Sequence, residues 1–590
     1  MSRTADRPST LLGAALSLPK GRGPRTGINH VAIGAALMLG FSVVHAQDAP
    51  PAQPAAPLLP ARVGVENGQP LPLSLADAIK LTLEQNNDVT IARLELDASR
   101  QDIRLAEGVY DPRVLNAISF QRTVSANASA IGGAVNGRLE QDLFAGSVGL
   151  DGLSPWGGGR YTFDFTSSRN ETSNQFARLN PQFPSAFSVS FVQPLVRNRS
   201  MDAERRQIQL ARRAVDLTDR QLLQVLMDQL TLVEQAYWDL VFAASNLEVQ
   251  TTALAQAESQ VASNERQARG GTLAPIDVVE AQTQVSTFRY SVASAQQALT
   301  EAENRLKTLM LANRHAPEWS RPIVPADVNE RASPGLGLPE AVKLAMDRRP
   351  ELAAIDTQRA QNEIDRAYFS DQSKPQLDIV GTYTLSGLAG GALQGTSNPI
   401  SGDDAALFAR LNELSERAGL TPLQSSPQTG ASVPDFLVGS YDESLSNLVS
   451  RRYPTALVQL QMELPIGNNA ARANLARTRI EANQITRRRE QMEQAIEAEV
   501  RNTLQAVQSS QQRLAAAASA RRNALEQYES ERRRFESGLS TVFLVLERQT
   551  TLVTTQAAEL RARADLNQAI ALLERAVGGT LEKHGVKLGG

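Results

Sequence analysis

The feature that most constrains this chain is a set of long segments without glycine or proline, which occur as two pairs. The long members run from Arg199 to Arg269 and from Asn468 to Ser537. Each is followed by a shorter member, Ile276 to Ala316 and Leu539 to Val577. With a helical rise of about 1.5 Å per residue, each long member would reach roughly 105 Å. That length is several times the diameter of a globular domain, so these helices cannot fold back into one compact core.

Apolar residues in the first long segment repeat with alternating spacings of four and three residues, which is a heptad seam. The residues of this seam are Leu226, Leu230, Val233, Tyr237, Leu240, Ala244 and Leu247. Helices that are this long and carry so narrow an apolar stripe are expected to pack as antiparallel coiled-coil hairpins.

Two glycine-containing turns, "RGGTLAPIDVVEAQ" and "FESGLSTVFLVLERQ", separate the long members from the short ones. Glycine readily adopts the left-handed conformation that ends a helix, and serine or threonine can cap the next one. We therefore predict hairpin tips near 270–275 and 537–541. The residues expected to form them are Gly270 and Gly271, with Thr272 as a cap and Pro275 in the first turn, and Gly538, with Ser540 or Thr541 as a cap.

The chain also repeats itself. "LADAIKL", from Leu75 to Leu81, aligns with "LPEAVKL", from Leu338 to Leu344, at a spacing of 263 residues. The two glycine turns follow at nearly the same spacing. We predict a first repeat over 73–333, a second over 334–580 and a C-terminal tail over 581–590.

Short stretches with a period of two lie between the helices. They are predicted strands at 161–166, 187–193, 376–385 and 455–465, with an extra strand-like pair at 114–120 and 147–153 whose place the sequence leaves open. Apolar and polar residues alternate over about ten residues, which is typical of transmembrane β-strands. Half-buried strands of a soluble sheet are the alternative. Segments 167–185 and 386–452 are expected to be loops outside the membrane, with a short helix in "DDAALFARLNELSERAG".

The N-terminus has the layout of a signal peptide, predicted over 1–46, in which Arg22 and Arg25 precede an apolar run from Val31 to Val44. A buried or interfacial helix is the alternative. A Pro/Ala-rich linker is expected over 47–72.

Composition excludes several classes of function. Lys and Arg number 60 against 63 Asp and Glu, so nothing favours a nucleic-acid partner. The chain has no cysteine, which excludes thiolate metal sites and a cysteine nucleophile. Neither a phosphate-binding glycine loop nor a metal-ligand cluster appears, so we expect no cofactor and no enzyme activity.

Taken together, the repeated "L-x-[DE]-A-[IV]-K-L" starts, the Gln193-Pro194-Leu195 strand end and the two glycine tips resemble the TolC-like outer-membrane efflux protein family. The resemblance covers nearly all of the chain after the signal peptide. It implies an α+β membrane protein that forms a homotrimer in the outer membrane of a Gram-negative bacterium. Long coiled-coil hairpins would build a periplasmic tunnel, and about four strands per chain would close one transmembrane β-barrel within the lipid.

The resemblance also implies partners and a site. A tripartite efflux or type I secretion system would use the channel as a passive exit duct, with a periplasmic adaptor and an inner-membrane pump. The adaptor would dock on the tips, which by position are Gly270, Gly271, Thr272, Leu273, Gly538, Leu539, Ser540 and Thr541. Acidic rings would form a gate inside the mouth, at the positions of Asp277, Glu280, Leu544 and Glu547.

The bland alternatives are that the glycines only end helices and that the carboxylates are solvated. Leu544 stands where the first copy has Asp277, so the second copy departs from a two-acid pattern. The competing interpretation of the whole chain is a periplasmic coiled-coil adaptor or scaffold without a pore, which would need no strand pairs.

Overall fold

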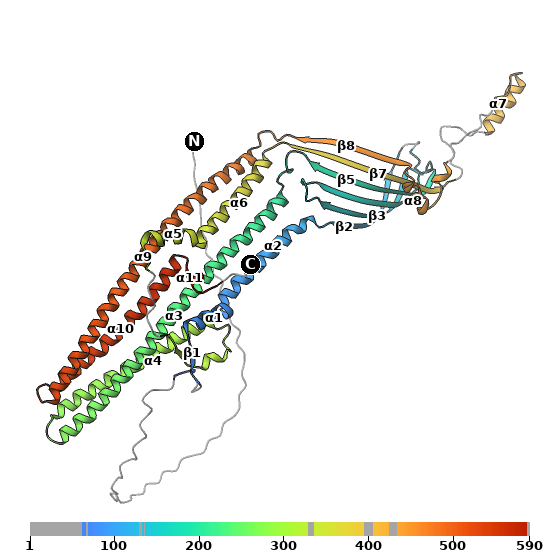
Figure 1. The fold of residues 1–590 in the computed structure, drawn as a ribbon. Coiled ribbons are helices and arrows are strands. Elements are labelled where there is room, and N and C mark those ends of the chain that lie inside the picture. The colour runs from blue at the N-terminus through green and yellow to red at the C-terminus, as the bar shows by residue number, and fades with distance from the viewer. Residues whose placement is uncertain are drawn as a thin grey trace, which may run out of the picture. The chain divides into compact units, whose positions relative to one another are not determined.

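The computed structural model describes residues 62–65, 69–128, 132–134, 136–327, 335–393, 405–423 and 433–586. The predicted signal peptide, 1–46, lies outside the described residues, and so does the predicted boundary between the repeats at 333–334. Within the unit from Ala61 to Gly590, helices, strands and a long helical hairpin follow one another twice along the chain (Figure 1).

The two copies contain matching helices, so the predicted two-repeat fold is confirmed. The first copy has α1 (Leu75–Gln85), α2 (Asn87–Glu107), α3 (Ala203–Arg269) and α4 (Pro275–Met310), and the second has α5 (Leu338–Arg348), α6 (Pro350–Gln372), α9 (Asn469–Glu536) and α10 (Val542–Ala576). The described residues also form short 3-10 helices, η1 (Gly108–Tyr110), η2 (Pro317–Ser320) and η3 (Asp435–Leu437), and a helix α11 (Thr580–Lys583) near the end of the chain.

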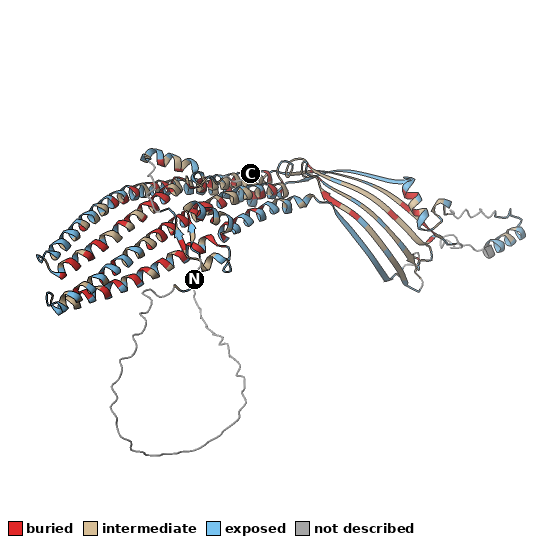
Figure 2. Cartoon of the chain, turned by 60° about the horizontal axis from the view of Figure 1, so that its bottom comes forward, coloured by how far each residue is buried: buried red, intermediate tan, exposed pale blue. Residues whose placement is uncertain are grey.

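The long helices form two antiparallel hairpins, α3 with α4 and α9 with α10, and α10 also packs on α3. Helix α3 has 67 residues, which corresponds to about 100 Å. Its predicted seam is correct from Leu226 to Leu240, where the seam residues are at most 1 % exposed. Figure 2 shows the resulting pattern, with buried stripes along helices whose other faces are exposed.

None of the described helices is both long enough and apolar enough to cross a membrane.

Six of the strands form one antiparallel sheet in the order β2-β3-β4-β5-β7-β8. Their bounds are β2 (Arg113–Ala126), β3 (Arg138–Leu153), β4 (Arg160–Thr172), β5 (Leu179–Pro194), β7 (Gln376–Ala392) and β8 (Tyr453–Glu463). The sheet therefore has six strands, whereas the family resemblance implies about four per chain. The extra pair whose place the sequence left open forms β2 and β3, at one edge of the sheet.

Two of the predicted loops are also shorter than expected, because strands extend into them. The loop predicted over 167–185 is reduced to the segment between Thr172 and Leu179. Strand β7 continues to Ala392, well into the loop predicted over 386–452. The helix expected in that loop is present as α7 (Ala405–Arg417).

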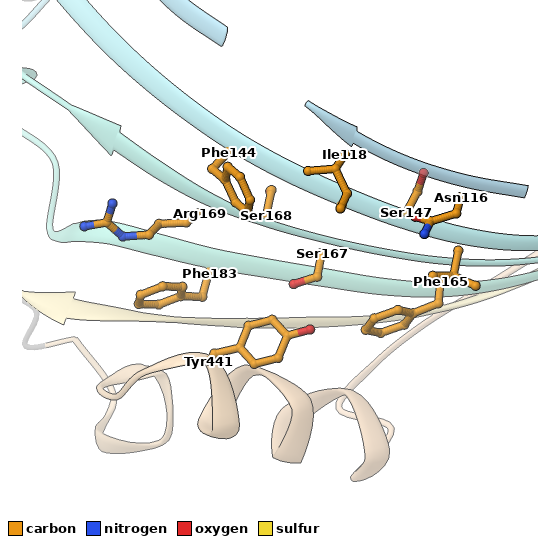
Figure 3. A pocket seen from close by; sticks show the side chains of 12 residues that line it. Asn116, Ile118, Phe144, Ser147, Phe165, Ser167, Ser168, Arg169, Phe183 and Tyr441 are labelled. Atoms are coloured by element: carbon orange, nitrogen blue, oxygen red, sulfur yellow. The ribbon is translucent and has the colours of Figure 1, made fainter. Parts of the chain in front are cut away.

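Register places the predicted apolar residues of neighbouring strands on one face. Tyr383 pairs with Ala456, and Ile379 pairs with Leu460, as the alternation predicts. At the end of the sheet that is away from the long helices, this face carries a groove of about 470 Å³. Ile118, Phe144, Phe165 and Phe183, from four successive strands, line it together with Tyr441 (Figure 3).

A helix missed by the sequence analysis, α8 (Tyr441–Val449), packs on β7 and β5. A Cβ atom at Gly387 would lie 2.1 Å from the carbonyl oxygen of Ser444, so only glycine permits this approach. The Ser185 and Ser444 hydroxyls are hydrogen-bonded at 2.8 Å. The small residues that obscure the strand pattern in this part of β7 are thus the ones that let α8 dock.

A buried carboxylate joins the two copies where the sheet meets the helices. Asp371, at the end of α6, accepts hydrogen bonds from the Asn198 N–H (2.6 Å), the Ser200 hydroxyl (2.7 Å) and the Lys374 ammonium (2.6 Å). Burial opposes ionisation of Asp371, but these three donors together hold the pKa of its carboxyl below the usual value. The ionised side chain therefore fixes the segment between β5 and α3 against the segment between α6 and β7.

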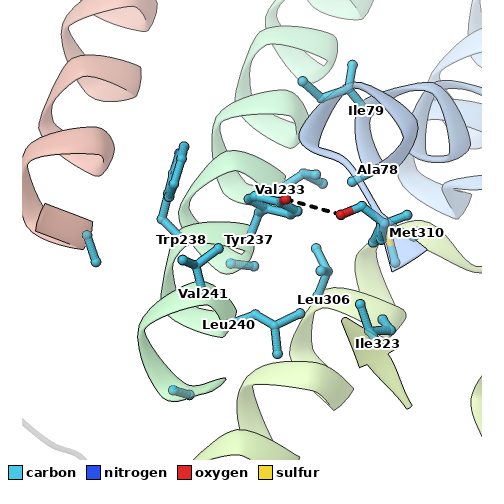
Figure 4. Packing of buried hydrophobic residues seen from close by; sticks show 14 of the residues in the cluster. Ala78, Ile79, Val233, Tyr237, Trp238, Leu240, Val241, Leu306, Met310 and Ile323 are labelled. Carbon is cyan, nitrogen blue, oxygen red and sulfur yellow. Dashed lines mark hydrogen bonds between the residues drawn. The ribbon is translucent and has the colours of Figure 1, made fainter. Parts of the chain in front are cut away.

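The largest hydrophobic cluster lies where α1 and α4 pack on α3 (Figure 4). Strand β1 (Leu71–Leu73) pairs there in parallel with β6 (Ile323–Pro325). Tyr237 donates to the Leu73 carbonyl and accepts from the Asp327 N–H, each at 3.1 Å. Burial raises the pKa of Tyr237 to about 12, so the phenol stays protonated and keeps this bond.

Both ends of the described chain are attached to this core. Before β1, Arg62 reaches Glu303 at 2.5 Å, so part of the predicted linker over 47–72 is held against α4. In the predicted tail over 581–590, His584 lies 2.5 Å from the buried Glu234 of α3. Neither segment is a free extension in its described part.

Candidate functional site at the hairpin tips

The two tips have the same backbone geometry. At the first tip, Gly271 has a φ of +76° and its N–H bonds to the Ala268 carbonyl, while the next N–H, of Thr272, bonds to the Gln267 carbonyl. At the second tip, Gly538 has a φ of +74°, and its N–H and that of Leu539 bond in the same pattern. These bonds satisfy carbonyls that the helix end leaves free, and the left-handed φ explains why glycine is needed.

Caps at the tips agree only partly with prediction. Thr541 caps α10 by accepting from the Leu544 N–H, and Pro275 occupies the first turn of α4, both as expected. Thr272 does not cap α4, because its hydroxyl bonds back to the Gln267 carbonyl and Ala274 takes the cap position. Ser540 does not cap α10 either, since its hydroxyl bonds to the Glu531 carboxylate.

The tips expose apolar side chains to solvent. Ile276 and Val279 on α4, and Leu539 and Phe543 at the second tip, are each more than half exposed. Leu273 instead packs against a small buried cluster of Ala281, Val542 and Leu546. Exposed apolar groups at the end of a rigid hairpin are suited to contact another protein.

Between the two hairpins, α4 and α10 border a groove of about 430 Å³. Its lining residues are Glu280, Thr283, Gln284, Phe543, Leu546, Glu547, Thr550 and Thr551. The side chains of Gln284 and Thr550 are hydrogen-bonded across it, at 2.9 Å.

The structure thus brings two of the four predicted gate residues together. Glu280 and Glu547, which are equivalent in the two copies, line one groove, whereas Asp277 and Leu544 do not line it. Sequence reasoning missed Gln284 and Thr550. Their signal was a row of polar residues on α4 and α10 at matching distances from the two glycine turns.

Comparison with known proteins finds both a matching family and solved structures with the same fold. A family model described as outer membrane efflux protein matches residues 161–310 and 341–579. The matched residues begin inside β4, so β2 and β3 precede them. No curated protein shows a significant match to the sequence.

Several solved structures share the fold. The outer-membrane channel OprN matches with a TM-score of 0.56 and 15 % identity over 86 % of this chain and 90 % of its own. The CmeC outer membrane channel of Campylobacter jejuni matches with a TM-score of 0.56 and 13 % identity over 86 % of both chains. The outer membrane protein VceC of Vibrio cholerae matches with a TM-score of 0.54 and 13 % identity, over 86 % of this chain and 96 % of its own.

Proposed function

Because the chain belongs to the outer membrane efflux protein family, we propose that it serves as the passive exit duct of a tripartite efflux or type I secretion complex. The family is one of outer-membrane channels with a large periplasmic part in Gram-negative bacteria, and it is not an enzyme family. Its members form trimers and work with an adaptor and an inner-membrane pump. The cargo, small molecules or proteins, is then chosen by the pump.

The observation that carries this proposal is the combination of long hairpins with a sheet that is apolar on one face. Helices of about 100 Å suit a tunnel through the periplasm. An apolar sheet face suits contact with lipid. A coiled-coil scaffold without a pore, the competing interpretation, would have no use for such a sheet.

We further propose that the tips, Gly270 to Leu273 and Gly538 to Thr541, dock the adaptor. The matching glycine turns give the two hairpins the same end shape. The exposed Ile276, Leu539 and Phe543 supply apolar contacts. The adaptor would therefore meet two similar surfaces on each chain.

Fractionation of cells that produce the full chain tests the exit-duct function. We expect the protein in the outer membrane fraction, as a trimer in non-denaturing detergent that dissociates on heating in SDS. Release by osmotic shock, or a monomer in mild detergent, would contradict the proposal. Pull-down of an adaptor and pump with the trimer would then identify the complex.

We also propose that Glu280 and Glu547 are the main residues of the periplasmic gate. Asp277 and Leu544 do not line the groove between α4 and α10. Three copies of each carboxylate would form rings of negative charge that favour cations. In planar bilayers, the double variant Glu280→Gln and Glu547→Gln is expected to lose most of its preference for potassium over chloride. Glu84→Gln, in α1 and outside the groove, is the control and should keep that preference. Unchanged selectivity in the double variant would remove both residues from the gate.

A further inference from the structure

We infer that all six strands of the sheet belong to the membrane wall, so that three copies of this chain close a barrel of eighteen strands. In this barrel, β2 of one copy pairs with β8 of the next copy. The inference rests on the trimer of the proposed function. It departs from the barrel of about twelve strands that four strands per chain would give.

The first argument is that β3 and β4 are inserted between β2 and β5 as regular members of the sheet. Every residue of β2 has a partner in β3, from Arg113 with Asp151 to Ala126 with Arg138. Strand β4 is paired along most of its length with β3 on one side and with β5 on the other. A hairpin that merely lay beside the barrel would not need this register.

The second argument is that the apolar face continues without a break through the inserted strands. One row across the sheet consists of Val114, Leu150, Phe163, Val189, Tyr383 and Ala456, one residue from each strand. The adjacent row, on the opposite face, consists of Leu115, Gly149, Asp164, Ser188, Thr384 and Thr455. Alternation of this kind is what a lipid-facing wall with a polar lumen requires, and the apolar row includes Val114 of β2, Leu150 of β3 and Phe163 of β4.

The third argument concerns the two edges. All residues of β2 and of β8 are exposed, and Val114 and Val458 are 71 % and 77 % exposed. An unpaired strand edge is not tolerated within lipid, because its backbone groups have no partner there. Strand β2 leaves the helices after α2, and β8 returns to them before α9, so the two edges run in opposite directions. They therefore fit each other as an antiparallel pair between two copies of the chain.

The consequence is a wider exit. Barrel diameter grows roughly linearly with strand number, so eighteen strands give about 1.5 times the diameter of twelve. Of the strands in this half of the sheet, β2 and β3 precede the residues matched by the family model, which begin inside β4.

Cysteine cross-linking tests the strand order, and the chain has no cysteine of its own. For the edge pairing, Gln459→Cys in β8 is combined with single cysteines at successive odd positions of β2 from Leu115 to Thr123, all on the polar face. Oxidation of outer membranes is expected to give covalent trimers at one register. Thr166→Cys in β4, combined with Gln459→Cys, is the matched control and should give none.

A second pair of variants tests whether β3 and β4 lie between β2 and β5. Ser119→Cys in β2 is combined either with Ala145→Cys in β3 or with Ala186→Cys in β5. The first pair is expected to form a disulfide within one chain, because these residues are register partners, and the second is not. Closure of the Ser119–Ala186 pair, or covalent trimers through Thr166, would overturn the eighteen-stranded barrel while leaving the trimer intact. Absence of any trimer before oxidation would instead count against the proposed function.

Discussion

Replacing Arg349 with alanine is expected to lower the free energy of unfolding by about 3 kcal/mol, because it breaks a largely buried ion-pair network. The Arg349 guanidinium lies 2.9 Å from Glu499 of α9 and 3.0 Å from Glu351 of α6. It also donates to the carbonyls of Arg575 and Ala576, at the end of α10. One side chain thus connects three helices of the second copy.

The network continues into the first copy. Arg575 pairs with Glu499 at 2.7 Å and with Asp228 of α3 at 2.7 Å. Burial acts against the charge of Arg575, yet the carboxylates of Asp228 and Glu499 raise its pKa above the usual value. Glu499 is thus shared by Arg349 and Arg575, so loss of Arg349 should also weaken the contact between the two copies.

Thermal melting of the trimer in detergent measures this effect. Arg348→Ala is the matched control, because the neighbouring Arg348 is 40 % exposed and pairs with the exposed Glu582. Exposed pairs of this kind contribute about 0–1 kcal/mol. Equal melting temperatures for the two variants would show that the network does not stabilise the fold.

Much of the helical architecture could be predicted, because it follows from local patterns. The heptad seam around Leu230 needs only a periodicity, and a glycine such as Gly538 needs only its own φ. The matching lengths of the helical segments in the two copies then predict the two hairpins.

The place of the extra strand pair, β2 and β3, could not be predicted, since glycines in β3 interrupt its alternation. Gly146, Gly149 and Gly152 occupy this strand where apolar or polar side chains would have revealed its two faces. Similarly, Gly387 in β7 is explained only by the approach of α8, a contact between segments far apart in the sequence. Such residues serve packing partners that a single-sequence pattern does not contain.

The sequence also could not predict which residues line the groove at the tips. Glu280 and Glu547 have equivalent places in their copies, but equivalence does not imply proximity. They line one groove because α4 of one hairpin lies against α10 of the other near the tips. Asp277, one turn earlier on α4, does not line this groove.

Linking the two hairpins across this groove is expected to abolish export. Gln284 and Thr550 are hydrogen-bonded at 2.9 Å and belong to different hairpins of the same chain. If the mouth opens by separation of the hairpins, a short thiol cross-linker between Gln284→Cys and Thr550→Cys prevents the motion. Efflux of a fluorescent substrate should fall to the level of cells that lack the channel, and cleavage of the linker should restore it.

The control for this experiment is a link of the same kind within one hairpin. Glu258 of α3 and Arg289 of α4 form an ion pair at 2.9 Å, so Glu258→Cys and Arg289→Cys can take the same reagent. Because α3 and α4 pack against each other as the two arms of one hairpin and would move as one body, this link should leave efflux unchanged. Full export by the Gln284–Thr550 cross-linked protein would mean that the mouth opens without parting α4 from α10, and the gate would then have to lie between neighbouring copies.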